Sequence, residues 1–72
     1  MKTDYHINIF YSEADGGYIA DIPDLPSCSA FGSTPAEALA ELEIARSAWF
    51  DAARAQGKPV PPPSYRPAII NR

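Results

Sequence analysis

One long segment with helical periodicity, STPAEALAELEIARSAWFDAARAQG, constrains the fold of this chain more than any other feature. Thr34 suits the N-cap, Pro35 suits the first helical position, and Glu37 completes a T-x-x-E capping box. Gly57 is a typical helix stop. We therefore predict one helix over residues 35–56.

One side of this predicted helix is apolar. At 100° per residue, eight residues fall within an arc of about 160°, wide enough to cover one face of a small sheet. They are Ala38, Leu39, Leu42, Ala45, Trp49, Phe50, Ala52 and Ala53. Arg46 is the one charge in the arc, near its edge. Ile44 lies opposite, among acids and alanines, and is a candidate contact for a basic partner helix.

The residues before the helix read as three short strands. Residues 4–11, DYHINIFY, alternate in polarity, SEADGG follows as a turn, and residues 17–22 return antiparallel as a second strand. Residues 28–31, CSAF, form a short third strand that ends at Gly32.

Two prolines bracket the connection between the second and third strands, IPDLPSC. Pro23 ends the second strand because proline donates no ladder hydrogen bond, and Pro26 keeps the connection extended while Leu25 turns inward. Proline fixes geometry but brings no chemistry. We therefore favour a rigid connection with one anchoring leucine over a ligand-binding loop.

These elements predict an α+β fold, β-β-β-α, with a three- to four-stranded, mainly antiparallel sheet and one long helix on one face. Residues 1–57 form the domain, and residues 58–72 extend it. Five prolines in those last fifteen residues favour an extended segment, although AII at 68–70 could add a short edge strand.

One helix covers only one face of such a sheet. If that face carries Ile7, Ile9, Ala20 and Ile22, the other face presents Phe10, Ile19 and Phe31. An uncovered apolar patch usually marks an interface, so we predict a homodimer or higher homo-oligomer through these three residues. The alternative is that the proline-rich tail folds over them and the chain stays monomeric.

Composition narrows the function classes. A formal charge of −3 and a pI near 4.8 argue against direct nucleic-acid binding, which depends on Lys and Arg neutralising phosphates. One cysteine allows no internal disulfide, and the chain shows neither a signal peptide nor a membrane-spanning segment. We expect a soluble cytoplasmic protein.

The sequence contains no specific catalytic set. Cys28 and His6 are predicted on different strands with no third orienting group, and one Cys with one His cannot form a zinc site. We expect no enzyme activity, no metal and no cofactor. A minimal metal-dependent nuclease using Asp21, Asp24 and a helix acid stays open as a less favoured alternative.

The string GGYIADIPDLPSCSAFGSTPAEAL resembles the amino-terminal domain of HicB-like antitoxins, whose pattern is a G-Y strand, a P-D-L-P-G-C connection, then G-D-T and an E-A-L helix start. The resemblance covers residues 5–63. Ser27 stands where the family usually has glycine, and Ser33 where it often has aspartate.

The resemblance implies a degenerate, partial RNase H-like fold without nuclease carboxylates. It also implies a partner, a small basic HicA-like toxin that cleaves mRNA and is inhibited by covering its active site. We expect no DNA-binding domain in this chain.

The function hypothesis is therefore an antitoxin-like binding module. The alternative is an orphan homo-oligomeric interaction module with no toxin. The candidate partner contacts are Asp21, Asp24, Ile44, Tyr65 and Pro67.

Overall fold

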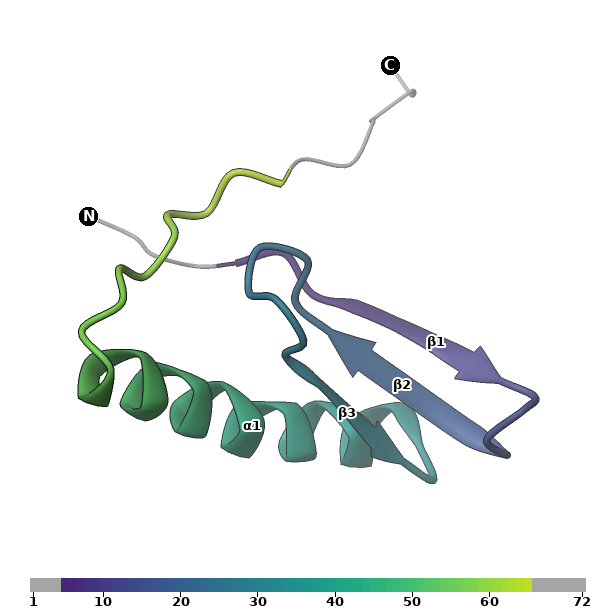
Figure 1. Ribbon diagram of the computed structural model, residues 1–72. Helices are drawn as coiled ribbons and strands as arrows, with labels where there is room; N and C mark the ends of the chain where they lie inside the picture. Colours follow the sequence, from purple (N-terminus) through teal and green to yellow (C-terminus); the bar gives the residue numbers. More distant parts are fainter. Residues whose placement is uncertain (1–4, 66–72) are drawn as a thin grey trace, which may run out of the picture.

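The computed structural model describes residues 5–65 and shows two layers, a sheet and one helix lying along one of its faces (Figure 1). The elements in chain order are β1 (Asn8–Ser12), β2 (Gly17–Asp21), β3 (Ser29–Gly32) and α1 (Pro35–Ala55). The described strands pair antiparallel in the order β1-β2-β3. The α+β, β-β-β-α prediction is confirmed. The strand considered at 68–70 lies outside the described residues.

The β1–β2 hairpin forms around a tight turn in SEADGG. The amides of Asp15 and Gly16 both donate to the Ser12 carbonyl, and Gly16 has the positive φ of 70° that the turn requires. The first strand begins at Asn8 rather than at residue 4. Asn8 pairs with Asp21, the last residue of β2, so the ladder has no partner strand beyond that point.

Both ends of α1 are capped as the sequence indicates. Thr34 Oγ1 accepts the amide of Glu37 at 3.1 Å, and the Glu37 carboxylate accepts the amide of Ser33 at 2.5 Å. At the other end Gly57 has φ 67°, and the Lys58 amide donates to the Ala53 carbonyl at 2.9 Å, a Schellman motif. The helix ends at Ala55, one residue earlier than predicted.

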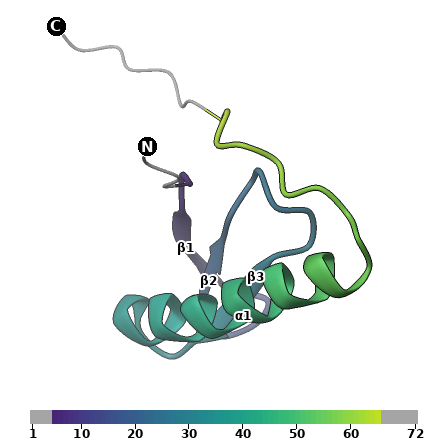
Figure 2. The ribbon, with the colours of Figure 1, turned by 90° about the vertical axis from the view of Figure 1, so that its left-hand side faces the viewer.

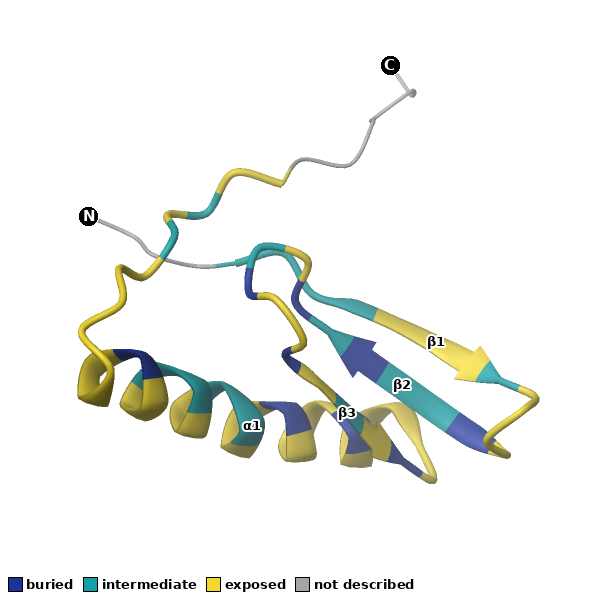
Figure 3. Cartoon of the chain, viewed as in Figure 1, coloured by how far each residue is buried: buried dark blue, intermediate teal, exposed yellow. Residues whose placement is uncertain are grey.

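The core lies between α1 and the face of β2 and β3 turned toward it (Figure 3). Leu25 is 1% exposed, so the leucine of the proline-bracketed connection turns inward as predicted. The other buried members of this cluster are Ala20, Ile22, Cys28, Ala38 and Leu42. Half-buried side chains pack around them, including Ile7, Tyr18, Trp49 and Phe50.

Gly32 sets how closely the helix approaches the sheet. A Cβ placed on Gly32 would lie 2.2 Å from the backbone nitrogen of Ala38, far inside contact distance. The first turn of α1 therefore rests on the backbone of β3, and a side chain at this position would push the two layers apart.

The predicted apolar faces were too wide. Leu39 is 37% exposed and Ala52 is exposed, although both fall in the predicted helical arc. Ile9 is on the helix side of β1 but is 39% exposed. The reason is geometric: the core joins α1 to β2 and β3, and β1 lies on the far side of β2 (Figure 2).

Candidate functional site

The sheet face turned away from α1 carries an uncovered apolar row. Cross-strand register places Phe10 opposite Ile19, and Ile19 opposite Phe31. Phe10 is 51% exposed and Phe31 is 45% exposed, so the tail as far as residue 65 does not bury them. We call these three residues the open-face row. The structure brings together the residues predicted as an oligomer interface. That role stays a prediction.

Gly17, at one end of the open-face row, leaves room for the ring of Phe31. A Cβ on Gly17 would lie 2.5 Å from Cζ of Phe31, so the phenylalanine ring occupies the space that a side chain at residue 17 would need. Gly17 is itself buried. The ring lies against the backbone and widens the apolar surface.

Asp21 lies on the same face as Ile19, two residues along β2, and pairs in register with Asn8 and Ser29. Its Oδ1 atom is buried and accepts no hydrogen bond from any described residue. Asp21 and Ser29 also line a hollow of about 210 Å³ bounded by the 22–28 connection. An acid with an unsatisfied oxygen therefore borders the apolar row.

Asp24 holds the proline-rich tail. Its carboxylate accepts the backbone amide of Ser64 at 2.9 Å, the Ser64 hydroxyl at 2.9 Å and the amide of Tyr65 at 3.0 Å. The structure thus brings two of the predicted partner contacts, Asp24 and Tyr65, side by side. Pro67 lies outside the described residues.

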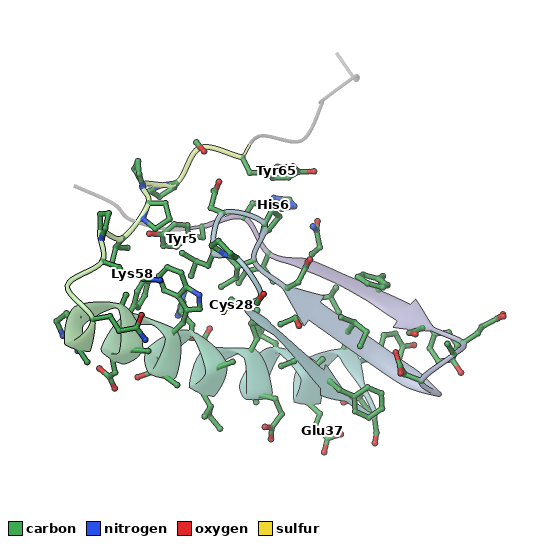
Figure 4. All side chains as sticks on the ribbon, in the orientation of Figure 1. Tyr5, His6, Cys28, Glu37, Lys58 and Tyr65 are labelled. Carbon is green, nitrogen blue, oxygen red and sulfur yellow. The ribbon has the colours of Figure 1, made fainter. Side chains whose placement is uncertain are left out.

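The amino-terminal segment makes two further contacts with the tail. The Tyr5 hydroxyl donates to the Pro61 carbonyl at 2.5 Å, and the His6 ring lies 4.8 Å, centroid to centroid, from the ring of Tyr65 (Figure 4). Residues 58–65 therefore cross the end of the sheet away from the β1–β2 turn (Figure 1). This position explains why the described tail leaves the open-face row exposed.

A groove of about 450 Å³ lies between the end of α1, the tail and the 22–28 connection. Its lining residues are Pro26, Trp49, Ala52, Ala53, Gln56, Lys58, Pro59 and Pro61. Trp49 Nε1 donates to the Pro26 carbonyl at 2.9 Å. No sequence pattern predicted this groove, because the tail that forms one wall carries no signal showing where it packs.

Ile44 is 65% exposed on α1, as predicted, and the helix belongs to the layer opposite the open-face row. The predicted partner contacts therefore do not form one surface. Asp21 borders the open face, Asp24 and Tyr65 form the tail contact, and Ile44 stands on the helix.

The structure places Cys28 and His6, the two side chains considered for a nucleophilic site, in different surroundings. Burial raises the pKa of the Cys28 thiol above its ordinary value; Arg46 opposes this shift and Asp21 adds to it. His6 Nε2 lies 2.7 Å from Asn8 Oδ1, and Figure 4 shows His6 beside Tyr65 while Cys28 lies toward the helix. Within residues 5–65, no three His, Cys, Asp or Glu side chains gather as a metal site. A separate finding concerns membranes: in the described part of the chain, no helix is long and apolar enough to cross one.

Comparison with known proteins identifies the family of this chain. No family model matches it. A UPF0150 protein of Synechocystis sp. is 38% identical over 53 residues, which cover 74% of this chain and 73% of that protein. The chain belongs to the UPF0150 family. UPF0150 proteins are related to HicB-like antitoxins, so the resemblance seen in the sequence is confirmed at this level.

The motif residues of this UPF0150 protein have identifiable structural tasks. Gly17 makes room for Phe31, Leu25 fills the core, and Gly32 admits the helix backbone. Ser27, which replaces the glycine of the HicB-like pattern, has φ 64°, a left-handed conformation that favours glycine. The motif string therefore describes how the connection and the helix are built, and a binding role has to come from the surfaces around it.

Proposed function

We propose that this UPF0150 protein is an antitoxin-like binding module that neutralises a small basic, HicA-like, mRNA-cleaving toxin by covering its active site. Membership of the UPF0150 family is the observation that carries the proposal. The proposed site of action is the cytoplasm, where mRNA is the toxin's substrate.

Charge supports this choice of partner. The chain has 9 acidic residues against 6 Lys and Arg, giving a formal charge of −3. Opposite net charges accelerate encounter with a basic protein, while buried apolar contacts determine most of the lifetime of the complex. The open-face row offers such apolar contacts.

The acidic net charge leads us to propose that the chain does not bind nucleic acid directly. We also propose that it does not cleave RNA. Asp24, one of the two acids considered for a nuclease, accepts hydrogen bonds from the tail at residues 64 and 65. A purified chain is expected to leave RNA intact with and without Mg²⁺ or Mn²⁺. Metal-dependent cleavage that disappears in Asp21→Asn would contradict this proposal.

Co-expression tests the antitoxin function. The small basic protein encoded beside this gene is expressed alone and together with this chain. We expect arrested growth in the first case, and restored growth with co-purification in the second. If the basic protein arrests growth, and this chain neither restores growth nor co-purifies with it, the proposed function is wrong.

The exposed open-face row also fits a second function, an orphan homo-oligomeric interaction module. It predicts a concentration-dependent dimer or larger oligomer in light scattering, converted to monomer by Phe31→Ser. A folded chain that stays monomeric at every concentration would exclude this alternative.

A further inference from the structure

We infer that the open sheet face binds a partner protein through an Arg or Lys side chain placed at Asp21, with apolar groups of the same partner on the open-face row. The inference rests on the proposed function only in taking the toxin as the natural source of this basic group. Its chemistry comes from the arrangement of residues on one face.

The acid and the apolar row form one surface. Asp21 and Ile19 are two residues apart on β2, so their side chains point to the same side of the sheet. Phe10 and Phe31 flank Ile19 and are about half exposed. A partner lying across the central strand therefore reaches the row and the carboxylate together.

Asp21 needs a donor that the described chain does not provide. Its Oδ1 is buried without a hydrogen-bond partner, although its register neighbours are Asn8 and Ser29. Buried carboxylate oxygens are normally satisfied by hydrogen bonds, and an Arg fork or Lys ammonium is the strongest donor for them. Because Oδ1 is covered in the free chain, the donor has to enter by way of the adjoining hollow of about 210 Å³, which the half-buried Asp21 lines together with Ser29.

A second copy of this chain fits the face less well. The residues that the strands turn to this side are Asn8, Phe10, Ser12, Gly17, Ile19, Asp21, Ser29 and Phe31. None of them is basic. Among the described cations, Arg46 and Arg54 are paired with acids on α1, and Lys58 is in the tail. Face-to-face packing of two copies would cover the row but would bring no cation from the strands to Asp21.

The first test uses a small probe of the inferred chemistry. Acetyl-Leu-Gly-Arg-amide places its Leu and Arg on one side when extended, matching the spacing of Ile19 and Asp21. The control peptide carries citrulline, which is neutral, in place of arginine. In NMR titrations of the full chain we expect amide shifts at residues 8, 19, 21, 29 and 31, and about fivefold tighter binding of the arginine peptide at low salt.

Matched variants show whether Asp21 is responsible. Asp21→Asn should abolish the preference for the arginine peptide, and Glu41→Gln, which removes an exposed helix acid, should retain it. Equal binding of the two peptides to the unaltered chain would overturn the inference. Shifts centred on Ile44 or Trp49 would overturn it equally.

Two further measurements, capture of the basic neighbouring protein and self-association, separate the proposed function from this inference. If the basic neighbour is captured, Asp21→Asn should weaken capture about 30-fold, and unchanged capture would overturn the inference. If no basic neighbour is captured, the proposed function fails while the peptide titration still decides the surface. A dimer that is abolished by Phe31→Ser, unaffected by Asp21→Asn and not dissociated by the arginine peptide would assign the face to a second copy. Phe10→Ser replaces Phe31→Ser if circular dichroism shows that the latter does not fold.

Discussion

At the scale of single residues, three positions have a backbone conformation or a close contact that restricts which side chain fits there. Ser27 adopts a left-handed conformation, Gly16 forms the hairpin turn, and Gly32 lies against the helix backbone. The physical reason for the restriction differs among these positions. The first two depend on φ, whereas Gly32 depends on the lack of a side chain, so substitutions should have different costs.

Ser27→Gly should stabilise the protein. A non-glycine residue at positive φ is strained, so glycine should raise the free energy of unfolding by about 1 kcal/mol. Urea denaturation measures the change. Ser29→Gly, in a strand, is the control and should destabilise by about 0.5–1 kcal/mol. Equal losses in both variants would show that Ser27 is not strained.

Gly32→Ala should destabilise strongly, because the new methyl group would meet the Ala38 backbone at 2.2 Å. We expect a loss of about 3 kcal/mol, at the upper end of the range for overpacking. Gly16→Ala, at φ 70° with open space around it, should cost only about 1 kcal/mol. Thermal melts followed by circular dichroism compare the two, and a milder effect at residue 32 than at residue 16 would contradict the close approach.

The Cys28 thiol should make stability depend on alkaline pH. Burial raises its pKa, so the folded protein holds this proton more tightly than the unfolded chain. The resulting stabilisation is fully present below the unfolded pKa, near 8.5, and is lost as pH rises through the folded value. Urea denaturation from pH 7 to 10 should show this decline, and Cys28→Ala should reduce its slope. The same slope in both proteins would exclude the thiol as its source.

At the scale of elements, α1 combines two capped ends with a narrow apolar contact. Only Ala38, Leu42 and Ala53 are buried on the helix, although it has 21 residues. A helix with so few buried side chains depends more than usual on satisfied ends. The interlocked hydrogen bonds of Ser33, Thr34 and Glu37 provide this at the amino end.

Thr34→Ala tests this dependence. It removes the side-chain acceptor for the Glu37 amide and should cost about 1 kcal/mol, lowering Tm by roughly 4–8 °C. Thr34→Ser keeps the hydroxyl and should remain close to the unaltered protein. Thermal denaturation provides the comparison, and identical Tm values for all three proteins would show that the cap is dispensable.

At the scale of the whole molecule, the tail is fastened to the domain. Tyr5 and Asp24 hold residues 61, 64 and 65 through hydrogen bonds, and His6 packs on Tyr65. These contacts position the tail at the end of the sheet and leave the open face accessible. The tail and the open face are therefore separate candidate surfaces.

Asp24→Ala should release the end of the tail while the domain stays folded. Amide hydrogen exchange at Ser64 and Tyr65 should accelerate about tenfold, the effect of losing roughly 1.4 kcal/mol of hydrogen bonding. Exchange in the middle of α1 should not change, because the hydrogen bonds that Asp24→Ala removes are to residues 64 and 65. NMR exchange rates measure both regions, and unaltered exchange at residues 64 and 65 would contradict the tail contact.

The sequence alone was sufficient for the local features. Thr34, Pro35, Glu37 and Gly57 set the helix bounds to within one residue, because capping and glycine conformation act within a few bonds. Strand alternation likewise predicted which side of the sheet Phe10, Ile19 and Phe31 share. The binding roles of these residues remain proposals.

Only the tertiary structure decided how far the two layers overlap and where the tail runs. Leu39 and Ile9 satisfy the apolar pattern yet are exposed, since the relative position of helix and sheet depends on contacts between distant segments, such as that between Trp49 and Pro26. The hydrogen bonds of Asp24 to the tail likewise join segments distant in sequence. Whether Asp21 Oδ1 finds a donor is also decided only by the packing around it. Sequence periodicity predicts the face of the helix or strand on which a side chain lies. Tertiary packing determines which groups that side chain contacts.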